Sequence, residues 1–424
     1  MCYRHIPISV AKAPLLDSQS VALKQWANAN KYLSHIELSD FDDTGRGVLL
    51  SSAIEANKPL IECDAGLFMS IFTALQSPVL GPLFNQLPEL DNDSKLILFV
   101  LYEKYVNPSS FWKPYLDLLP ERVDSALFFT DEDLAYVAGT TLGMEISYTQ
   151  QHLLESYEEI MSAVEERFSI FDRQNFSWER FKWARSMFDS RGFNLTLQGK
   201  ARNCLLPFID SINSTHYTHL QSRGYIDETK KSHFSDLGTY VLPTLVPCSN
   251  VGSQVFLNYG GFSTRELVLF YGFAYEEEEN PYDLYTLTLD LPDDDYAAER
   301  MALASAIGVS TDHYLRATSI SMDIVDYLSL VVLPPTHVLE LANSDSASIR
   351  LVLRSEGQLV SVKDILKSML QALIDNMEAE SPFLASPPSS FPSNCAKIGF
   401  VYTRSQHNIL THSLRMVSSW NVVN

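Results

Sequence analysis

Three separate stretches of the chain carry residue types that can hold a charged ligand. The first is Thr44-Gly45-Arg46-Gly47-Val48. Paired glycines let a backbone fold closely against a flat or charged ligand, because no Cβ atom blocks the approach. Alone the signal is weak, since most Gly-x-Gly triplets are plain turns, and this one lacks the glycine pattern of a dinucleotide site or a P-loop.

The second stretch places polar groups at the end of an apolar run. Ser190-Arg191-Gly192-Phe193 precedes the run 205–214, which ends in Asp210, Asn213 and Ser214. These residues offer a charge and an amide at one point of the chain. A buried strand that ends in an Asx turn is the more ordinary interpretation of such a run.

The third stretch, Gly252–Gly260, is followed by Tyr271-Gly272-Phe273. Tyr259 and Tyr271 therefore bracket a helix-like segment that comes after a strand. Taken alone, these tyrosines are explained by packing in a core. Only the occurrence of all three stretches in one chain gives them weight.

The composition describes a globular protein of two domains. A chain of 424 residues is too long for one ordinary core, and its 46% hydrophobic and 20% charged residues exclude a disordered protein. The 31 basic and 52 acidic residues give a formal charge of -21. This charge repels nucleic-acid phosphate and anionic membrane and attracts cationic partners, although solubility alone explains it equally well.

The five cysteines stand singly, without a Cys-x-x-Cys pair. The pattern favours neither a disulfide framework nor a cysteine zinc site, and it is typical of a reducing compartment. His216 and His219, near Cys204, lack the ligand pairs of a zinc site, so we expect no metal. We find no signal peptide and no apolar run near the ~18 residues that span a bilayer. We therefore expect the cytoplasm, with the nucleus as the alternative.

The elements that must position the three stretches alternate between β-rich and helical. We expect a helix at Ser18–Tyr32 and a β-rich stretch at Gly45–Met69. Apolar residues at three- and four-residue spacing predict helices from about 74 to 185. Short strands and loops follow at 186–275, and the acidic stretch Glu276–Glu279 is interpreted as a boundary.

Beyond this boundary the residues again predict helices. Apolar side chains fall on one face of Asp364–Met377, as in an amphipathic helix that faces a core. Ser381–Asn394 is rich in proline and serine and is expected to be a flexible loop. No internal repeat of fixed period is visible.

In their order and spacing, the three stretches resemble the SET family of protein methyltransferases. They are most similar to the branch typified by the Rubisco large-subunit and ribosomal-protein lysine methyltransferases. That branch shows G-x-G, a helical insert, S-R-x-F, P-x-x-D-x-x-N-H, and G-E/D-Q-V/I-x-x-x-Y-G ahead of E-L-x-x-x-Y-G-F. Tyr402–Leu410 also looks like the Y-x-x-x-Q-x-x-I-L ending of the branch. The resemblance covers about residues 20 to 415 and is strongest between Trp183 and Asp283.

The resemblance implies an α+β fold and a set of site residues. A β-rich SET domain at 1–275, with a helical insert at about 74–185, would precede an all-helical, substrate-binding-like domain at 276–424. The cofactor S-adenosyl-methionine, the methyl donor, would lie against Thr44, Gly45, Arg46, Arg191, Asn213, Ser214 and Tyr259.

The same resemblance assigns the residues that would bind the substrate and catalyse the reaction. Arg191, Asp210 and Tyr271 would bind the substrate side chain, and Tyr259 would be the catalytic residue. A lysine has an ordinary pKa near ~10.4, so few lysines are neutral at pH 7. Desolvation between aromatic rings and the nearby sulfonium both disfavour the ammonium form. The Tyr259 hydroxyl would orient the neutral amine, and alignment of the two bound reactants would supply much of the rate.

Three residues depart from the family pattern. Ser214 replaces the usual histidine, Ser253 stands where an acid is usual, and Thr264 stands where asparagine is common. These departures keep open a catalytically inactive, SET-like binding protein. A related branch methylates histidine, which is a second alternative, since imidazole is already largely neutral at pH 7.

The resemblance therefore implies a protein-lysine N-methyltransferase that acts on the ε-amine of a non-histone protein. We expect a ribosomal or other translation-related substrate, such as a ribosomal protein or an elongation factor. A basic substrate suits the acidic surface. We expect no direct binding to nucleic acid, no membrane association, and a monomer.

Overall fold

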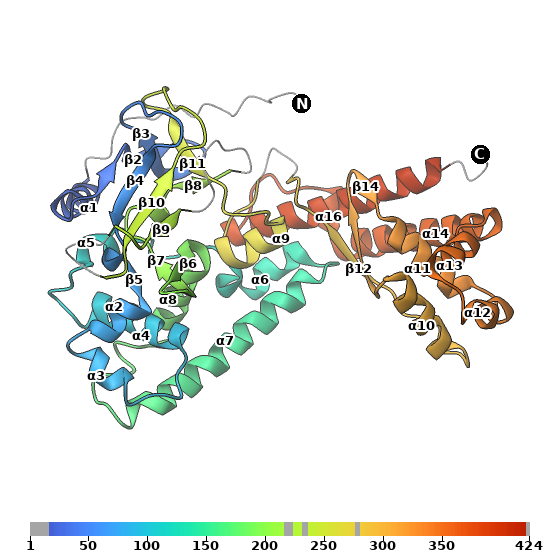
Figure 1. The fold of residues 1–424 in the computed structure, drawn as a ribbon, viewed down its shortest axis with the longest axis horizontal. Coiled ribbons are helices and arrows are strands. Elements are labelled where there is room, and N and C mark those ends of the chain that lie inside the picture. The colour runs from blue at the N-terminus through green and yellow to red at the C-terminus, as the bar shows by residue number, and fades with distance from the viewer. Residues whose placement is uncertain (1–16, 216–223, 231–235, 276–279, 421–424) are drawn as a thin grey trace. The chain divides into compact units, whose positions relative to one another are not determined.

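The computed structural model describes residues 17–215, 224–230, 236–275 and 280–420 (Figure 1). They form two compact units. The first unit comprises the chain up to Phe128 together with Ser147–Phe262 and Leu269–Gly272. The second comprises Phe129–Ile146, Ser263–Val268 and the chain from Phe273 onward. Each unit is described by itself, and the expected boundary between residues 275 and 276 stays a prediction.

Strands and helices alternate along the chain (Figure 1). The strands are β1 Leu33–Ser34, β2 Ile36–Phe41, β3 Gly45–Leu50, β4 Pro59–Asp64, β5 Met69–Ser70, β6 Gly192–Leu197, β7 Lys200–Leu205, β8 Asn213–Ser214, β9 Tyr225–Asp227, β10 Thr239–Pro243, β11 Gln254–Leu257, β12 Tyr285–Thr288, β13 Asp312–Arg316 and β14 Ser319–Ile320. The α-helices are α1 Ser18–Ala29, α2 Ile71–Gln76, α3 Leu80–Phe84, α4 Asn92–Tyr105, α5 Lys113–Leu116, α6 Asp131–Leu134, α7 Leu142–Glu165, α8 Trp178–Arg191, α9 Thr264–Glu266, α10 Ala297–Ile307, α11 Met322–Val332, α12 Pro335–Leu341, α13 Ser346–Leu353, α14 Glu356–Glu380, α15 Pro382–Ala385 and α16 Asn394–Ser419. Short 3₁₀ turns include η4 Ile209–Ser211, and a π-helical segment, η5, covers Leu267–Tyr271.

Three small sheets form the β-rich part of the first unit. Their strand orders are β1-β4-β10-β9, β2-β3-β11-β8 and β5-β7-β6. One continuous apolar core, which includes the fully buried Leu60, Phe68 and Tyr240, lies among these sheets and the helices that follow them. Because every sheet combines strands from distant parts of the sequence, the sheets bring together segments that no local rule would pair.

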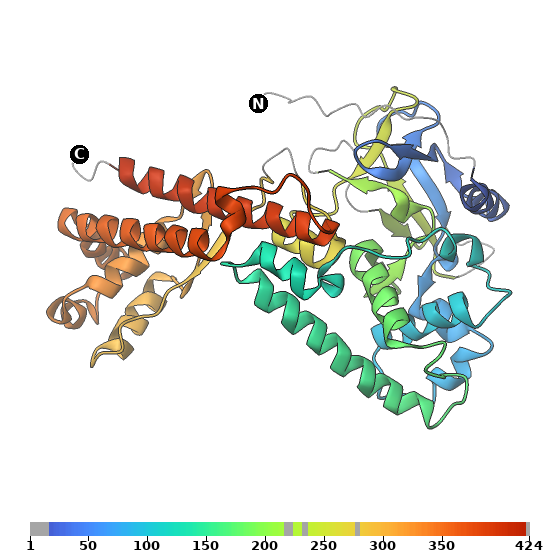
Figure 2. The same ribbon diagram turned by 180° about the vertical axis from the view of Figure 1, so that it is seen from behind.

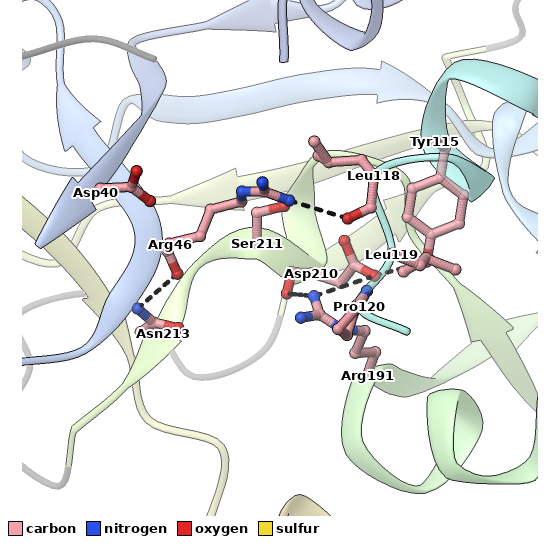
Figure 3. Close-up of a pocket in the computed structure, with 10 residues that line it drawn as sticks. All are labelled: Asp40, Arg46, Tyr115, Leu118, Leu119, Pro120, Arg191, Asp210, Ser211 and Asn213. Carbon is pink, nitrogen blue, oxygen red and sulfur yellow. Dashed lines mark hydrogen bonds and ion pairs between the residues drawn. The ribbon is translucent and has the colours of Figure 1, made fainter. Parts of the chain in front are cut away.

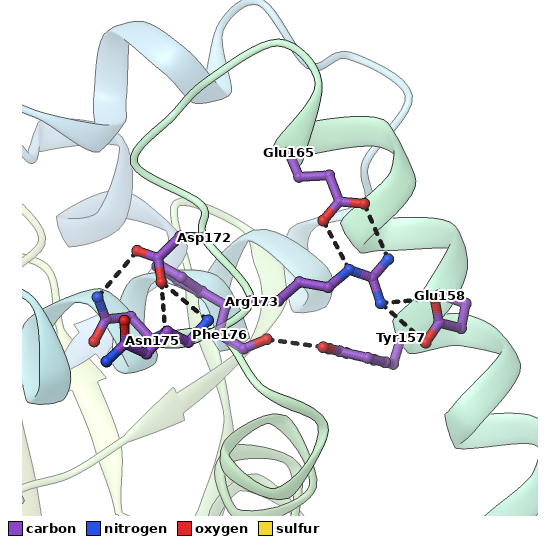
Figure 4. A network of polar contacts seen from close by, with 8 residues as sticks. Tyr157, Glu158, Glu165, Asp172, Arg173, Asn175 and Phe176 are labelled. Atoms are coloured by element: carbon purple, nitrogen blue, oxygen red, sulfur yellow. Dashed lines mark hydrogen bonds and ion pairs between the residues drawn. The ribbon is translucent and has the colours of Figure 1, made fainter.

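The stretch from about 74 to 185, where a helical insert is expected, is mainly helical. Its helices α2, α3, α4 and α5 follow β5, and α8 leads back into β6. The turn between α7 and α8 is fixed by polar contacts: Arg173 contacts Glu158 and Glu165 on α7, and Tyr157 donates to the carbonyl of Phe176 at 3.0 Å (Figure 4). These contacts fix the turn between α7 and α8 within the first unit.

The second unit is mainly helical, with α14 and α16 side by side (Figure 2). The expected amphipathic helix is part of α14, with Leu366, Leu370 and Ile374 buried in a separate core. This part of the chain is not all-helical, however, because β12, β13 and β14 form an antiparallel sheet. Strands this short leave too few apolar residues for a period-2 pattern to stand out.

The expected flexible loop at Ser381–Asn394 is also more ordered than its composition suggests. Residues Pro382–Ala385 form α15, and Phe383 stacks on Tyr136 with ring centroids 4.3 Å apart. Phe391 packs against the edge of the same tyrosine. The packing of Phe383 and Phe391 on Tyr136 thus orders this segment in spite of its proline and serine content.

Two earlier expectations fall on residues outside the description, namely His216 with His219, and the boundary stretch Glu276–Glu279. Among the described residues, no single helix is long and apolar enough to cross a membrane. One helix pair, α11 with α12, meets that length and composition together but is bent by 117°.

Candidate active site

One four-stranded sheet brings the three chemical stretches together. In the order β2-β3-β11-β8, strand β11 pairs antiparallel with β3, so that Gln254 lies opposite Leu49. On its other side β11 pairs in parallel with β8, so that Asn213 lies opposite Phe256. Residues that are about 40 and 205 positions apart in sequence therefore become neighbours. The convergence of these stretches is a property of the sheet.

The side-chain amides of Asn213 and Gln254 hold the turn between β2 and β3. Asn213 Nδ2 donates to the carbonyl oxygens of Arg46 at 3.1 Å and Thr44 at 3.4 Å. Gln254 Nε2 donates to Thr44 Oγ1 at 2.7 Å. A Cβ atom on Gly47 would lie 2.8 Å from both amide nitrogens, so only glycine fits without displacing them. The glycine-rich turn and the asparagine thus form one structure.

A cavity of about 340 Å³ lies beside this turn (Figure 3). Two cationic and two acidic side chains are part of its wall, which is made by Asp40, Arg46, Tyr115, Leu118, Leu119, Pro120, Arg191, Asp210, Ser211 and Asn213. A wall that carries both signs of charge is suited to a zwitterionic ligand, because each charged group of the ligand can meet an opposite one. Among the described residues, no group of three or more metal-ligating side chains is present.

Asp210 is the most perturbed acid of this wall. Its side chain is buried and accepts a hydrogen bond from the Tyr115 hydroxyl at 2.6 Å. Arg191 Nη1 donates to the Asp210 backbone carbonyl at 3.0 Å and lies 3.9 Å from the carboxylate. Burial raises the pKa of Asp210 to about 6, although Arg191 and the Tyr115 bond both act to lower it. Asp210 is therefore ionised at neutral pH and loses its charge in mild acid.

Two polar atoms of this pair are left without a hydrogen bond in the part of the chain that the structure describes. Asp210 Oδ1 and Arg191 Nε are buried and have no hydrogen-bond partner among the described residues. A buried polar atom without a partner is costly unless a ligand or water satisfies it. S-adenosyl-methionine carries an ammonium, a carboxylate and a sulfonium, and the residues of the cavity fit these groups by charge.

The predicted tyrosines lie together, outside the residues that line this cavity. The rings of Tyr259 and Tyr271 stack with centroids 5.3 Å apart, and Phe262 packs on Tyr271 at 5.4 Å. The Tyr259 hydroxyl donates to the carbonyl oxygen of Ile212 at 2.8 Å, which ties it to the residue before β8. The two aromatic side chains assigned to the target channel are thus adjacent, and Tyr259 is hydrogen-bonded to Ile212, the residue before Asn213.

Ser214, the replacement of the family histidine, makes a contact of its own. The backbone N–H of Tyr259 donates to Ser214 Oγ at 3.4 Å, at the long limit for such a bond. The parallel pairing of Ser214 with Leu257 is made by backbone groups alone. The position therefore depends mainly on its backbone, so serine is compatible with the local structure.

We expect Ser214→Ala to weaken the affinity for S-adenosyl-methionine by no more than about two- to threefold, because a long hydrogen bond contributes little. Asn213→Ala should weaken it considerably more, because both bonds that hold the Thr44–Arg46 turn are lost. Calorimetric titration of the two variants checks this order. Equal losses in the two variants would contradict it.

Sequence reasoning did not identify the part of the wall that comes from the helical insert. Tyr115, Leu118, Leu119 and Pro120 line the cavity although no motif marks them. Their only sequence signal is an aromatic residue next to a proline, in Lys113-Pro114-Tyr115, which predicts no contact. The other predicted residues, from Thr44 to Tyr271, are all placed at the sheet, the cavity or the tyrosine pair.

Comparison with known proteins identifies the fold of the chain. No family model matches the chain. The chain superposes on a crystal structure of the SET domain of LSMT bound to lysine and AdoHcy, with a TM-score of 0.71, 18% identity, and coverage of 96% of this chain and 92% of the other. A structure of Rubisco LSMT bound to AdoMet gives a TM-score of 0.69 at 19% identity, covering 95% and 92%. The chain has the fold of the SET domain in these structures. Its fold is that of the Rubisco-methyltransferase-like branch, as the motifs predicted.

Two curated relatives differ in the residue that they modify. The chain is 29% identical over 359 residues to the chloroplastic [fructose-bisphosphate aldolase]-lysine N-methyltransferase of Arabidopsis thaliana, a match that covers 80% of this chain and 71% of the relative. It is 25% identical over 341 residues to the actin-histidine N-methyltransferase of Papio anubis, covering 78% and 55%. The chain thus spans only about half of the length of the histidine methyltransferase.

Proposed function

We propose that this SET-domain protein transfers a methyl group from S-adenosyl-methionine to the ε-nitrogen of a lysine in a non-histone protein. The observation that carries the proposal is the position of the cavity. It lies beside the turn that Asn213 and Gln254 hold, and Tyr259, which follows β11, stacks on Tyr271.

The chemistry requires few protein groups, because the sulfonium methyl is already activated. Arg46, Arg191 and Asp210 would hold the charged amino-acid end of the cofactor or the amine of the target. Tyr259 would orient the neutral target amine by accepting a hydrogen bond at its hydroxyl oxygen. The O–H of the same hydroxyl donates to the carbonyl oxygen of Ile212. The aromatic walls would exclude water and favour the neutral form of the amine, and water would take up the released proton.

A second function, methylation of a histidine, is favoured by the actin-histidine N-methyltransferases among the relatives. Lysine stands first because the relative with higher identity and longer coverage is a lysine methyltransferase. Mass spectrometry of the modified peptide separates the two functions, since the fragment ions locate the methyl group on one residue or the other.

The substrate that we propose is basic and belongs to the translation apparatus, a ribosomal protein or an elongation factor. The formal charge of -21 supports a basic partner, because opposite charges speed encounter and suppress wrong partners. We further propose that the protein acts as a monomer in the cytoplasm, with the nucleus as a second location.

Incubation of the purified protein with labelled methyl donor and a cell extract tests the proposal. We expect label in a basic protein band that co-purifies with ribosomes, and loss of this label when the purified protein is omitted. If the protein binds S-adenosyl-methionine in calorimetry but labels no band, catalysis is contradicted and the inactive binding protein is favoured. If the band is acidic or unrelated to translation, only the proposed substrate class is contradicted.

A further inference from the structure

The segment 113–120 of the helical insert is fixed in place by side-chain donors from other elements. Lys104 Nζ donates to the carbonyl of Leu116 at 2.7 Å, and Trp183 Nε1 donates to that of Pro120 at 2.9 Å. Arg46, which lies on β3 next to the glycine turn, donates to the carbonyl of Leu118 at 3.0 Å (Figure 3). Three carbonyls within five residues are thus held, so this segment of the insert is a fixed part of the cavity wall.

Tyr115 is the residue of this segment that reaches Asp210. Its side chain is 1% exposed, so its hydroxyl cannot be satisfied by solvent. The bond of 2.6 Å from the hydroxyl occupies Asp210 Oδ2. It leaves Oδ1, the oxygen without a partner among the described residues, as the acceptor that the cavity presents.

We infer that Tyr115 is a positioning residue, which holds the Asp210 carboxylate so that its second oxygen accepts a hydrogen bond from a cationic nitrogen bound in the cavity. This inference rests on the proposed function. The carboxylate of a free aspartate can rotate about its Cβ–Cγ bond. The hydrogen bond from the buried Tyr115 hydroxyl removes that freedom before the ligand binds. The nitrogen is the ammonium of S-adenosyl-methionine or the amine of the target lysine.

The charge of Asp210 makes the inference sensitive to pH. The groups that face Asp210 are Arg191 from α8, Tyr115 from α5 and Tyr32, which follows α1. Burial raises the pKa values of both tyrosines, so neither tyrosine ionises near neutral pH. Asp210 alone changes charge near pH 6, and binding of a cation should weaken as the pH falls through that value.

The test is Tyr115→Phe, which removes one oxygen atom from the buried side chain. Loss of the hydroxyl removes a hydrogen bond that lowers the pKa of Asp210, so the pH at which binding is half lost should move upward. At pH 7 we expect the affinity for the cationic ligand to fall about tenfold, the effect of losing a hydrogen bond to a charged group. Tyr157→Phe is the matched control, because Tyr157 is equally buried and also loses one hydroxyl bond, to the carbonyl of Phe176.

Calorimetric titrations between pH 5 and pH 8 provide the readout, in two arms. The first titrates S-adenosyl-methionine, and the second titrates free lysine into protein saturated with S-adenosyl-homocysteine. An upward shift and a weaker affinity in one arm, for Tyr115→Phe and not for Tyr157→Phe, support the inference and identify which nitrogen Asp210 meets. Equal pH profiles of Tyr115→Phe, Tyr157→Phe and the unchanged protein in both arms overturn it while the proposed function stands. If the unchanged protein binds neither ligand, the proposed function fails and the inference falls with it.

Discussion

Replacement of Tyr259 by phenylalanine should reduce the rate of methyl transfer by about a hundredfold or more, the usual loss when one positioned hydrogen-bonding group is removed from a reaction centre. The Tyr259 hydroxyl is fixed by its bond to the Ile212 carbonyl, so its oxygen has a defined direction. Its ring stacks on Tyr271 and would still stack in the variant. The loss should therefore appear in kcat, whereas the affinity for S-adenosyl-methionine stays within about threefold.

The rate of label incorporation into the substrate band, at saturating methyl donor, measures this effect. Tyr327→Phe is a suitable control, because Tyr327 also donates its hydroxyl to a backbone carbonyl, that of Leu289 at 2.9 Å, in the second unit. The two variants should have similar melting temperatures and very different rates. If Tyr259→Phe keeps more than about a tenth of the activity, Tyr259 is not the catalytic residue.

Replacement of Gly47 by alanine should have the second large effect, on the cofactor. The new Cβ atom would lie 2.8 Å from the amide nitrogens of Asn213 and Gln254 and 3.3 Å from the Phe41 ring. Both amides must move, and each then loses its bond to the Thr44–Arg46 turn. Each lost hydrogen bond costs about 1 kcal/mol, so we expect the affinity for S-adenosyl-methionine to fall about tenfold or more.

Calorimetry and a thermal melt check this result together. Gly357→Ala is the control: a Cβ atom there meets nothing within 4 Å, and alanine favours the helix α14 more than glycine does. The control should bind the cofactor as the unchanged protein does. An unchanged affinity in Gly47→Ala would mean that the turn does not contact the cofactor.

The sequence predicted those parts of the fold that depend on local patterns. The apolar spacing of Lys95–Tyr105 and of Asp364–Met377 is continuous over several turns, and both segments are helical. The start of the β-rich stretch at Gly45 and the helix-like segment before Tyr271 were likewise visible. Family resemblance then supplied the residues of the site, because their order along the chain carried the information.

The rest depends on contacts between distant residues. Tyr115 lies on a helix of only four residues, which is too short for any periodicity, and its partner Asp210 is 95 positions away. Phe208 has a left-handed φ of 72°, which no propensity assigns to phenylalanine, and this turn precedes the η4 residues that include Asp210. Asn213–Ser214 is a strand of two residues, which only the neighbouring β11 makes a strand.

The position of β11 within its sheet has a consequence for the order in which the chain folds during synthesis. Along the chain β11 is the last of its four strands, yet in space it is the inner partner of both β3 and β8. A nascent chain that has emerged from the ribosome only to about residue 250 can pair β2 with β3, but it has nothing to join either of them to β8. The ligand pocket is therefore assembled late, by a long-range closure that is intrinsically slow. Pulse-labelling of growing chains should find cofactor protection only after the segment Gln254–Leu257 has left the exit tunnel.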